Sequence, residues 1–523
     1  MTEAARKEAD RLVGRAPDDR RALKGARAYA LALEELAPTV GRALAASWRF
    51  GSLVADQPRP GEVRLDYVFV APGVRVPVVL GLSVPPAGVP SIALACPAAS
   101  WAEREVSDLF GVTFSGSPDP RPLVHHEDWP EGLFPLRAGV NPPLPVERVS
   151  GQYPFRHVEG EGVMELRVGP IHAGIIEPGH FRFTAVGETV LGLEVRMFYV
   201  HRGVERLAQG RVPAAALAIA ERVSGTASVA HSVAAARAME AALRIEVPAA
   251  HALVRSLLLE LERLYNHAGD LGNLCAGTAL SVALAEGLII KERLLAMNQA
   301  LSGSRYLRNL VGLGGVRRAP SSADLDSALT GATAALESVE RLANGIFGSA
   351  TNLERLSGTG LLSPEHVRAL GVVGVVARAS GVRTDSRVDL AFPTPADSEI
   401  YGTLKPATET GADVAARAQV RLAEARESLR LCQGIVTRLA DTDPAPPGIS
   451  DRTGGEGLGW AEGPRGEILT FVRLEAGRVA RLRVRSPSRM NWPAIEHAIP
   501  GNIVPDFPLI NKSFNLSYAG CDL

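Results

Sequence analysis

The most constraining feature of the sequence is a long apolar stripe in "VRSLLLELERLYNHAGDLGNL", residues 254–274. Apolar residues recur there at steps of three and four, which places them on one face of an α-helix; they are Leu257, Leu261, Leu264, Ala268 and Leu271. Such a stripe predicts a long helix that contributes to a hydrophobic core. Similar helical patterns return at about 281–302, 321–347 and 411–440, so helices dominate this part of the chain.

Three regions differ in pattern. Residues 1–117 combine a helical start with short β-type runs such as "GEVRLDYVFVA", which predicts a small α/β domain. Residues 118–154 are rich in proline and show neither the helical nor the strand periodicity of apolar residues, which indicates a linker or a wrapping arm. Residues 155–523 begin with strand-like segments, continue as helices, and end with a strand pair at "GEILTFVRLEAGRVARLRVRS" and an irregular C-terminus. The expected fold class is α+β.

Composition excludes several functions. A formal charge of −1 gives no overall field that attracts nucleic acid or an anionic membrane, so no nucleic-acid partner is expected. The four cysteines lie far apart without a CxxC pair, which predicts neither disulfides nor a zinc or iron–sulfur site in this chain. No phosphate-binding glycine loop, HExxH or GxSxG motif occurs. No signal peptide or uninterrupted membrane span is visible, so a cytoplasmic protein is expected.

Longer phrases carry a family resemblance. Residues 103–137, "EREVSDLFGVTFSGSPDPRPLVHHEDWPEGLFPLR", resemble the 30-kDa-type subunit of respiratory complex I. "GPIHAGIIEPGHFRF", "YVHRGVERLA", "LVGLGGVRR" and "AEGPRGEI" follow in the order of the 49-kDa-type subunit. The same phrases resemble still better the large subunits of membrane-bound, complex-I-like [NiFe] hydrogenases of the hydrogenase-3 and hydrogenase-4 kind, in which both modules are fused. The resemblance implies a 30-kDa-like domain at 1–117 and a mainly helical, hydrogenase-large-subunit-like domain with small sheets at 155–523.

The resemblance also locates four former nickel-ligand positions. In the hydrogenases two CxxC pairs hold nickel and iron, and soft thiolates suit that centre. Here the first pair reads "RVSGTASVAHS" and the second reads "SFNLSYAGCDL". The aligned residues are Ser224, Ala227, Ser517 and Gly520, with Cys521 one residue beyond the last. We therefore expect no [NiFe] centre and no metal bound by this chain.

Other site residues follow from the same resemblance. In complex I a histidine and a tyrosine grip the quinone; His172 or His180 matches the histidine, but the tyrosine position falls at about Gly225. Glu177 resembles a proton-transferring glutamate, with capping of a turn as the alternative. Arg465 resembles an arginine above the active site, with pairing to a carboxylate as the alternative. The two histidines also have a structural alternative.

A further set of residues has a structural alternative that is stronger than the functional one. Glu205 resembles a magnesium-supporting glutamate and is a weak magnesium candidate, because the partner C-terminal histidine is absent; an internal ion pair is the alternative. Asp385 and Arg387 in "RTDSR" are expected to form a buried pair. His231 and His267 are expected to be core histidines with satisfied hydrogen bonds.

The sequence therefore predicts a subunit of a membrane-associated oxidoreductase without a [NiFe] centre. The resemblance implies partners: a small [4Fe–4S] subunit of the complex I 20-kDa type, a ferredoxin-like subunit, and antiporter-like membrane subunits that hold the chain on the inner face of the cell membrane. Three functions stay open. The chain takes part in electron transfer to quinone or another acceptor coupled to ion translocation, or it is a catalytically silent coupling subunit, or it is a working [NiFe] hydrogenase large subunit.

Overall fold

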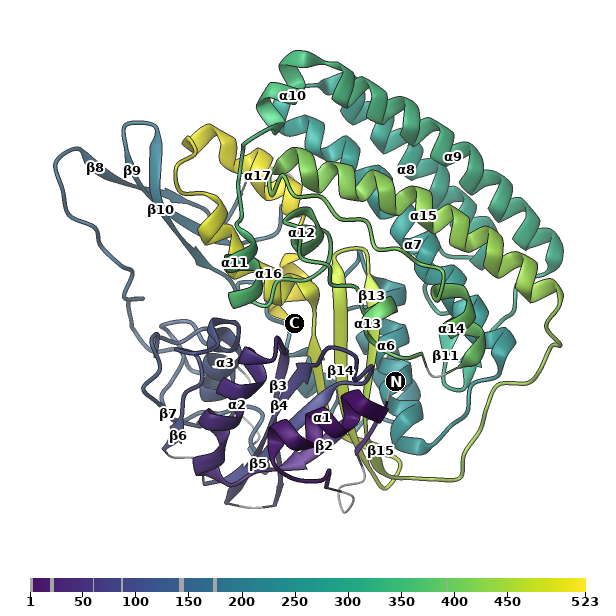
Figure 1. Cartoon of the computed structure of the whole chain (residues 1–523). Helices are drawn as coiled ribbons and strands as arrows, with labels where there is room; N and C mark the ends of the chain where they lie inside the picture. The colour runs from purple at the N-terminus through teal and green to yellow at the C-terminus, as the bar shows by residue number, and fades with distance from the viewer. Residues whose placement is uncertain are drawn as a thin grey trace.

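The computed structural model describes residues 3–18, 23–59, 61–85, 88–140, 145–172, 176–392 and 394–523. It confirms the α+β class: a mixed-sheet N-terminal unit precedes a large, mainly helical unit with small sheets (Figure 1). Within the described ranges, no helix is both long and apolar enough to span a bilayer.

A four-stranded sheet forms the centre of the N-terminal unit, in the order β2-β5-β4-β3. Strand β2 runs parallel to β5, and the other neighbours are antiparallel. Three helices and a small strand pair complete the unit. The bounds are α1 (Glu3–Val13), β2 (Arg27–Ala30), α2 (Leu36–Ala45), β3 (Arg49–Arg59), β4 (Glu62–Val70), β5 (Val78–Val84), β6 (Val89–Pro90), α3 (Ser100–Phe110) and β7 (Phe114–Ser115).

The proline-rich arm connects the two units without forming a helix or strand in its described residues, 118–140 and 145–154. Buried arginines from both sides hold it through backbone carbonyls. Arg104 on α3 donates from Nε to Arg121 O at 2.8 Å, and Arg196 donates from Nη1 to Pro122 O at 2.9 Å. The arm therefore lies against both units rather than hanging free between them.

Two small sheets belong mainly to the second unit. The sheet β10-β9-β8 follows the arm, and the sheet β1-β13-β14-β15 takes its first strand from the N-terminal segment. Their bounds, with those of the short pair β11-β12, are β1 (Leu23–Lys24), β8 (Val163–Val168), β9 (His180–Val186), β10 (Thr189–Arg196), β11 (Val311–Gly312), β12 (Gly315–Val316), β13 (Gly455–Gly463), β14 (Gly466–Glu475) and β15 (Arg478–Arg485).

The alanine-rich helix α6 (Ser228–Leu243) lies directly on the glycine-rich strand β13. A Cβ placed on Gly457 would be 2.0 Å from Ala238 O, and one on Gly459 would be 2.3 Å from Ala234 O. Only glycine permits this approach of two backbones. The contact explains why "GEGLGWAEG" forms a strand although the sequence pattern did not predict one there.

Long helices pack against one another in the second unit (Figure 1). Helix α7 (Ala249–Cys275) contains the predicted apolar stripe. All five residues of the stripe are buried. The predicted helices are confirmed as α8 (Ser281–Ser302), α9 (Ser322–Gly348) and α15 (Val414–Ala440). Shorter helices are α4 (Val204–Ala208), α5 (Pro213–Ala220), α10 (Ala350–Leu356), α11 (Pro364–Ala369), α12 (Gly374–Ala379), α13 (Ser386–Asp389) and α14 (Pro395–Tyr401).

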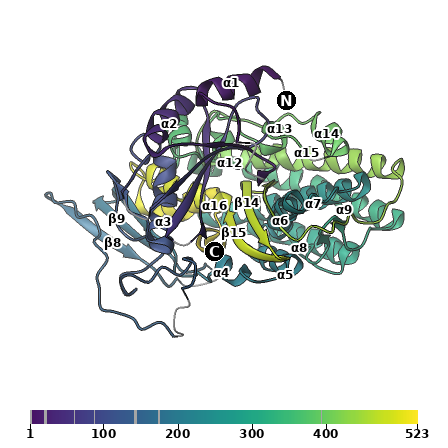
Figure 2. The ribbon, with the colours of Figure 1, turned by 90° about the horizontal axis from the view of Figure 1, so that it is seen from below.

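The prediction of an irregular C-terminus was wrong. Three helices occupy it: α16 (Pro487–Ala498), α17 (Phe507–Phe514) and α18 (Tyr518–Asp522). Proline at the first or second position starts α16 and α17, where its missing N–H costs no hydrogen bond. Figure 2 shows that the C-terminal end lies in the centre of the molecule, close to β15 and α4.

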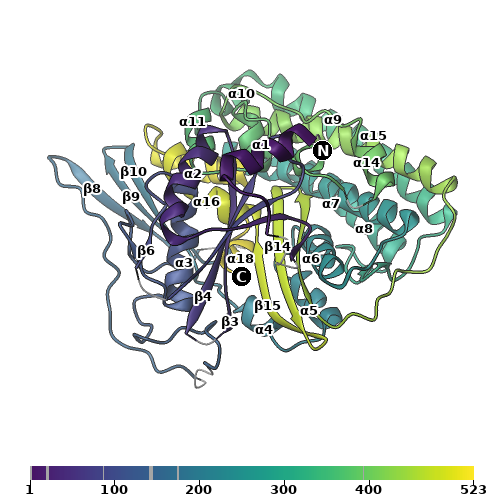
Figure 3. The ribbon, with the colours of Figure 1, turned by 60° about the horizontal axis from the view of Figure 1, so that its bottom comes forward.

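The two units share a buried, charged contact. Strand β3 lies beside β14 and β15 (Figure 3). Asp56 on β3 accepts hydrogen bonds from Arg473 at 2.7 and 3.0 Å, and Arg481 donates to Ala55 O at 2.8 Å. Arg64 adds a second guanidinium 3.2 Å from Asp56. These contacts fix the N-terminal sheet against the second unit.

Candidate functional site

Two segments far apart in the sequence meet at the candidate site. One is the turn at 220–228 before α6, and the other is the C-terminal segment at 515–523. Ser224 Oγ donates a hydrogen bond to Ser517 Oγ at 2.9 Å across 293 residues of sequence. Ser224 is almost fully buried. The first residues of the two former nickel-ligand pairs are thus in direct contact.

The other two predicted positions complete the same contact. Gly520 N donates to Ser517 Oγ at 2.9 Å, and a Cβ on Gly520 would lie 3.3 Å from Ser224 Cβ. Ala227 N donates to Ser224 O at 3.2 Å, and the Ala227 side chain is buried. The side chains at the four positions are therefore two hydroxyl groups, a methyl group and a hydrogen atom.

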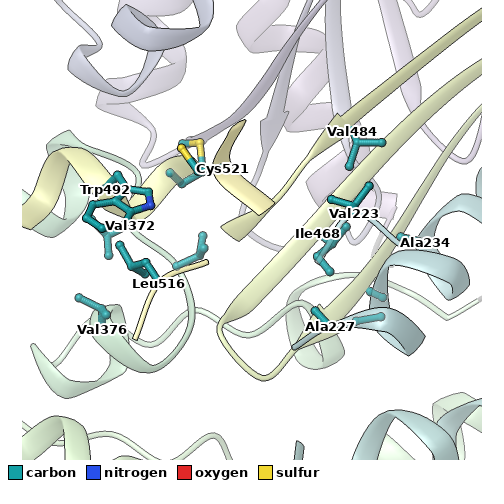
Figure 4. Close-up of a cluster of buried hydrophobic side chains, with 14 of the residues drawn as sticks. Val223, Ala227, Ala234, Val372, Val376, Ile468, Val484, Trp492, Leu516 and Cys521 are labelled. Atoms are coloured by element: carbon teal, nitrogen blue, oxygen red, sulfur yellow. The ribbon is translucent and has the colours of Figure 1, made fainter. Parts of the chain in front are cut away.

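Apolar residues surround this contact. Figure 4 shows Val223 and Ala227 from the first segment and Leu516 and Cys521 from the second in one cluster of buried side chains, together with Trp492. Burial raises the pKa of the Cys521 thiol well above its usual value, so the thiol stays protonated near neutral pH. Among the described residues, no three histidine, cysteine, aspartate or glutamate side chains form a group able to hold a metal ion.

Arg202 ties the two segments together from the solvent side. Its Nη2 donates to Val223 O and to Ala519 O, both at 2.8 Å. Its backbone N–H donates to Leu523 O at 2.6 Å. One exposed arginine therefore links the turn before α6 to both ends of α18.

Glu177 lies at the start of α18. Its Oε2 accepts a hydrogen bond from Ala519 N at 3.0 Å, next to the Ser517 hydroxyl that accepts from Gly520 N. The structure thus places Glu177 beside two of the predicted ligand positions, with its side chain exposed to solvent. The carboxylate caps the start of α18 rather than a turn before Pro178, and its proton-transferring role stays a prediction.

His172 and His180 both bind the loop between β8 and β9. His172 Nε2 is 2.8 Å from Gly179 O, and His180 Nδ1 is 3.3 Å from Gly169 O. Burial lowers the pKa of His180, so its imidazole is neutral near pH 7. One nitrogen of each ring contacts a backbone carbonyl, which fits the structural alternative. Glu177 lies in the same loop.

Arg465 occupies the two-residue turn between β13 and β14 and reaches both segments. Its Nη1 donates to Asn266 Oδ1 at 3.0 Å, and Asn266 in turn donates to Thr226 O at 3.0 Å. Its Nε donates to Asn515 O. The same guanidinium lies 3.5 Å from Asp270. Arg465 therefore pairs with a carboxylate, as the structural alternative predicts, and also contacts the second segment through Asn515 O.

Asp270 stays ionised because of these cations. Burial alone would raise its pKa, but Arg465 and Arg421 outweigh burial and hold the pKa below its usual value. The positive charge of Arg465 is thus balanced inside the protein.

Glu205 lies away from this contact and is held by two arginines. Its Oε2 accepts from Arg481 at 2.7 Å, and its Oε1 accepts from Arg483 at 3.2 Å and from Val484 N at 3.1 Å. Both oxygens thus bind donors of this chain, which is the predicted internal ion pair. The predicted pair of Asp385 and Arg387 is also present and buried, with Nη2 and Oδ2 2.7 Å apart.

His231 and His267 were predicted to be core histidines with satisfied hydrogen bonds. Their burial is confirmed, but their hydrogen bonding is incomplete. Both His231 and His267 are buried, and His267 Nε2 is 2.7 Å from Glu424 Oε2. However, Nδ1 of each ring has no hydrogen-bond partner among the described residues. Burial lowers the pKa of His231 to about 3, which keeps the ring neutral.

Sequence reasoning missed Glu262 on α7. Its two carboxylate oxygens accept hydrogen bonds from Val229 N at 2.7 Å and Ala230 N at 3.0 Å, so it caps α6 directly behind the site. Burial raises its pKa to about 8, against the opposing effect of these two N–H groups. An acidic residue in the apolar pattern "LLLELERL" was the only signal, and that signal does not reveal the partner helix.

Arg308 is a second residue that sequence reasoning missed. Its Nε donates to Ser228 Oγ at 3.2 Å, and its Nη2 lies 3.9 Å from where a Gly225 Cβ would be. A guanidinium therefore lies beside the position at which the expected tyrosine is lacking.

Comparisons with known protein families match three parts of the chain. The family described as respiratory-chain NADH dehydrogenase, 30 Kd subunit, matches residues 39–143. The corresponding 49 Kd subunit family matches residues 281–449. Residues 202–276, which contain the turn before α6, match the nickel-dependent hydrogenase family.

Curated relatives extend over most of the chain. Formate hydrogenlyase subunit 5 of Escherichia coli is 33% identical over 83% of this chain and 76% of the relative. Hydrogenase-4 component G of the same organism is also 33% identical, over 83% of this chain and 75% of the relative. An NADH-quinone oxidoreductase subunit of Streptomyces coelicolor is 32% identical over 66% of this chain and 92% of the relative.

A solved structure has the same fold. A chain of the membrane-bound sulfane sulfur reductase, an archaeal respiratory membrane complex, superimposes with a TM-score of 0.64 at 22% identity, covering 70% of this chain and all of that chain. Together with the sequence relatives, this places the chain in the family of complex I-type 30-kDa and 49-kDa subunits, here fused in one chain and related to the hydrogenase-4 and formate hydrogenlyase subunits.

Proposed function

We propose that the chain is a nickel-free subunit of a membrane-associated, complex-I-like oxidoreductase, in which it couples redox subunits to ion-translocating membrane subunits. The hydrogen bond between Ser224 and Ser517 carries this proposal. It joins two of the four positions at which the hydrogenases need thiolates, and it does so by a hydrogen bond of 2.9 Å between two neutral hydroxyl groups.

The donor set does not fit a nickel–iron centre. Such a centre requires soft thiolate ligands, and the four positions offer two hydroxyls, a methyl group and a hydrogen. A serine hydroxyl is neutral near pH 7 and is a hard oxygen donor. Cys521 supplies one sulfur at most, and its thiol is buried and protonated.

The surrounding contacts support a coupling role. Glu177, Arg202 and Arg465 connect the loop after β8, the turn before α6 and the C-terminal segment into one hydrogen-bonded unit. A displacement of the loop is therefore transmitted to α18 and to the turn. We place electron transfer in partner subunits, namely a small [4Fe–4S] subunit of the complex I 20-kDa type and a ferredoxin-like subunit, and ion transport in antiporter-like membrane subunits.

These partners imply a location and an architecture. The chain sits peripherally on the inner face of the cell membrane, held by its partners. We also propose a division into domains at about residues 117 and 154. In support, the last strand of the N-terminal unit ends at Ser115, and the next strand begins at Val163.

Metal analysis of the complex, purified with its partner subunits, tests the main proposal. Iron from partner clusters is expected, with nickel far below one atom per chain. Stoichiometric nickel would show that the chain is a hydrogenase large subunit instead. An assay for hydrogen oxidation with the same preparation is expected to give no activity.

Quinone binding is a second candidate, favoured by the loop between β8 and β9. Ile171 and Ile176 expose 87% and 44% of their surface there, beside His172 and Glu177. Apolar side chains next to hydrogen-bonding groups suit a quinone headgroup. The tyrosine that grips the headgroup in complex I is absent, so this site lacks one donor.

Photolabelling with a quinone analogue separates the two functions. A coupling subunit is expected to show neither quinone reduction nor labelling of the loop. Labelling at the loop that is lost in His172→Ala but kept in the control His157→Ala would establish the quinone site. His157 is a suitable control because it is an exposed histidine that pairs with Glu165 at 2.9 Å, outside the loop.

A further inference from the structure

A large cavity lies where the N-terminal unit, the arm, β10 and α16 meet. Its volume is about 510 Å³, within the range of small-molecule sites. Trp101 of α3, Arg156 after the arm, Leu193 of β10 and Met490 of α16 each contribute to its wall. The cavity is separate from the contact between Ser224 and Ser517, and none of its lining residues belongs to that contact.

The wall of the cavity is rich in arginine. Eight of the lining residues are arginines and three are acidic. Four of these arginines form ion pairs with carboxylates that do not line the cavity: Arg182 with Glu165, Arg483 with Glu105 and Glu205, Arg485 with Glu467, and Arg489 with Glu105.

Among the residues that the structure describes, the other four arginines have too few anionic partners. Asp119 serves three of them, at 3.1 Å from Arg104, 2.8 Å from Arg121 and 3.9 Å from Arg156. Glu194 pairs with Arg121 as well. Two lining carboxylates therefore face three guanidinium groups.

Arg196 is the fourth of these arginines. It donates to the carbonyls of Pro122, Leu123 and His125, and its nearest carboxylate is Glu127 at 3.6 Å. Burial lowers the pKa of Arg196, and the nearby carboxylate of Glu127 does not offset that effect. This side of the cavity thus carries excess positive charge.

Glu496 on α16 does little to remove this excess. It accepts one hydrogen bond, from Val195 N at 2.9 Å, and burial raises its pKa to about 7. The charges that act on it are Glu194 on β10, Arg156 after the arm and Arg104 on α3. Near neutral pH a large fraction of Glu496 is therefore uncharged, and its protonated carboxyl group is a donor for an anionic oxygen.

Apolar side chains form another part of the cavity wall. Trp101, Leu193 and Met490 line it, and Leu94 and Val158 are 79% and 49% exposed among its lining residues. Exposed apolar side chains beside a cavity indicate a binding site, because their contact with water is unfavourable. The cavity therefore offers apolar surface next to uncompensated positive charge.

We propose that this cavity binds a small organic anion, a carboxylate or phosphate group on an apolar body. The anionic group pairs with Arg156, which lies 3.9 Å from the shared carboxylate of Asp119, and the apolar body packs against Trp101 and Met490. The proposal goes beyond the coupling function and does not depend on it. Because the ligand contacts the N-terminal unit, β10 and α16 at once, it also fastens these elements together.

Calorimetric titration of the full-length chain tests the proposal with four probes. Octanoate and octyl phosphate carry both features, acetate lacks the apolar body, and 1-octanol lacks the charge. Saturable binding of at least one of the first two is expected, with acetate and 1-octanol weaker by about tenfold or more. The tighter of the two amphiphiles identifies the head group. If neither binds, or if acetate or 1-octanol binds as tightly, the proposal is wrong.

Two variants at exposed positions locate the binding without endangering the fold. Leu94→Glu adds a negative charge to apolar surface at the cavity and is expected to weaken binding about tenfold. Arg156→Gln removes one partly exposed cation and is expected to weaken binding about threefold.

Matched controls lie far from the cavity. Val282→Glu changes another exposed apolar residue, 73% exposed on α8. Arg11→Gln removes a guanidinium 79% exposed on α1, compared with 72% for Arg156. Both controls are expected to keep the affinity of the unmodified chain. Unchanged affinity in Leu94→Glu would place the ligand elsewhere and overturn the proposal.

Discussion

Ser517 has two structural roles that rest on one oxygen atom. It accepts the hydrogen bond from Ser224 that joins the two segments, and it caps α18 by accepting from Gly520 N. Two serine hydroxyls do not bind nickel as thiolates do. Here they hold the two segments together by a hydrogen bond instead. The contact is therefore small, polar and dependent on single side chains.

Ser517→Ala is expected to lower the free energy of unfolding by about 1–2 kcal/mol, because it removes both a cap and a cross-segment hydrogen bond. Denaturant unfolding measures the change. Ser363→Ala is the matched control, since Ser363 caps α11 and makes no such cross-segment bond to another hydroxyl. A double-mutant cycle with Ser224→Ala isolates the pair, with an expected coupling of about 1 kcal/mol. Zero coupling would mean that the segments are held by other contacts alone.

Glu262 makes the stability of the site depend on pH. Its folded pKa of about 8 lies above the ordinary value of 4.5. The protonated form therefore favours the folded state, and this contribution is complete below about pH 4.5 and lost as pH rises through 8.

Glu262→Gln is expected to remove that loss. Between about pH 5 and pH 8 the unmodified protein should lose roughly 2–4 kcal/mol through this group, and the variant should not. Urea unfolding at both pH values gives the comparison. Glu292→Gln is the control, because Glu292 is exposed and pairs with Arg305 at the surface. An equal loss in unmodified protein and variant would show that Glu262 is ionised in the folded state throughout.

At the scale of elements, the sequence predicted what depends on local periodicity. The stripe on α7 and the spans of α8, α9 and α15 were correct within a few residues, because apolar residues recur at helical spacing along these segments. The stripe did not reveal that α7 is buried on nearly all sides. Strand β13 and helices α16 to α18 were missed. These elements are short or rich in glycine, so their structure depends on the element they pack against. Gly457 and Gly459 of β13, for example, allow close contact with α6.

The same division applies to the candidate site. Family resemblance located Ser224, Ala227, Ser517 and Gly520, Glu177 and Arg465, and the structure brings the first segment, the second segment and these two side chains together. Glu262 and Arg308 escaped prediction because their roles depend on tertiary neighbours. The sequence around Glu262 on α7 and around Arg308 before β11 does not indicate that both side chains contact the start of α6.

Arg202→Gln is expected to loosen α18 without unfolding the molecule. The variant loses the bonds to Val223 O and Ala519 O. Amide hydrogen exchange at Cys521 and Leu523, whose N–H groups bond within α18, should accelerate by about tenfold. Arg222→Gln is the control, since the Arg222 side chain donates to Ala218 O and Glu221 in its own segment. Unchanged exchange at α18 would mean that Ser517 and Glu177 hold the helix on their own.

At the scale of the whole molecule, the junction between the two units depends on Asp56. Although burial acts to raise its pKa, Arg473 and Arg64 hold that pKa below the usual value. The junction is thus stabilised by an ionised, buried carboxylate. This stabilisation is present above the ordinary carboxyl pKa of 3.8 and is lost as pH falls through the lower folded value.

Asp56→Asn is expected to destabilise the protein by about 3 kcal/mol, because it leaves buried guanidinium groups without their anion. Thermal unfolding monitored in both units should show the loss. Asp128→Asn is the control: Asp128 pairs with Arg148 at 2.9 Å, with side chains 45% and 55% exposed, and its loss should cost less than about 1 kcal/mol. Equal effects of the two substitutions would place the strength of the junction in its apolar contacts.

The contact between α6 and β13 has a consequence for the way the molecule moves. Because two backbones touch there without a layer of side chains, the start of α6 and the turn that carries Arg465 keep a fixed separation. The loop with Glu177 and the last nine residues are held instead by individual side-chain hydrogen bonds. The site therefore has a rigid half and an adjustable half. The proposed coupling function therefore requires movement of the adjustable half against the rigid half.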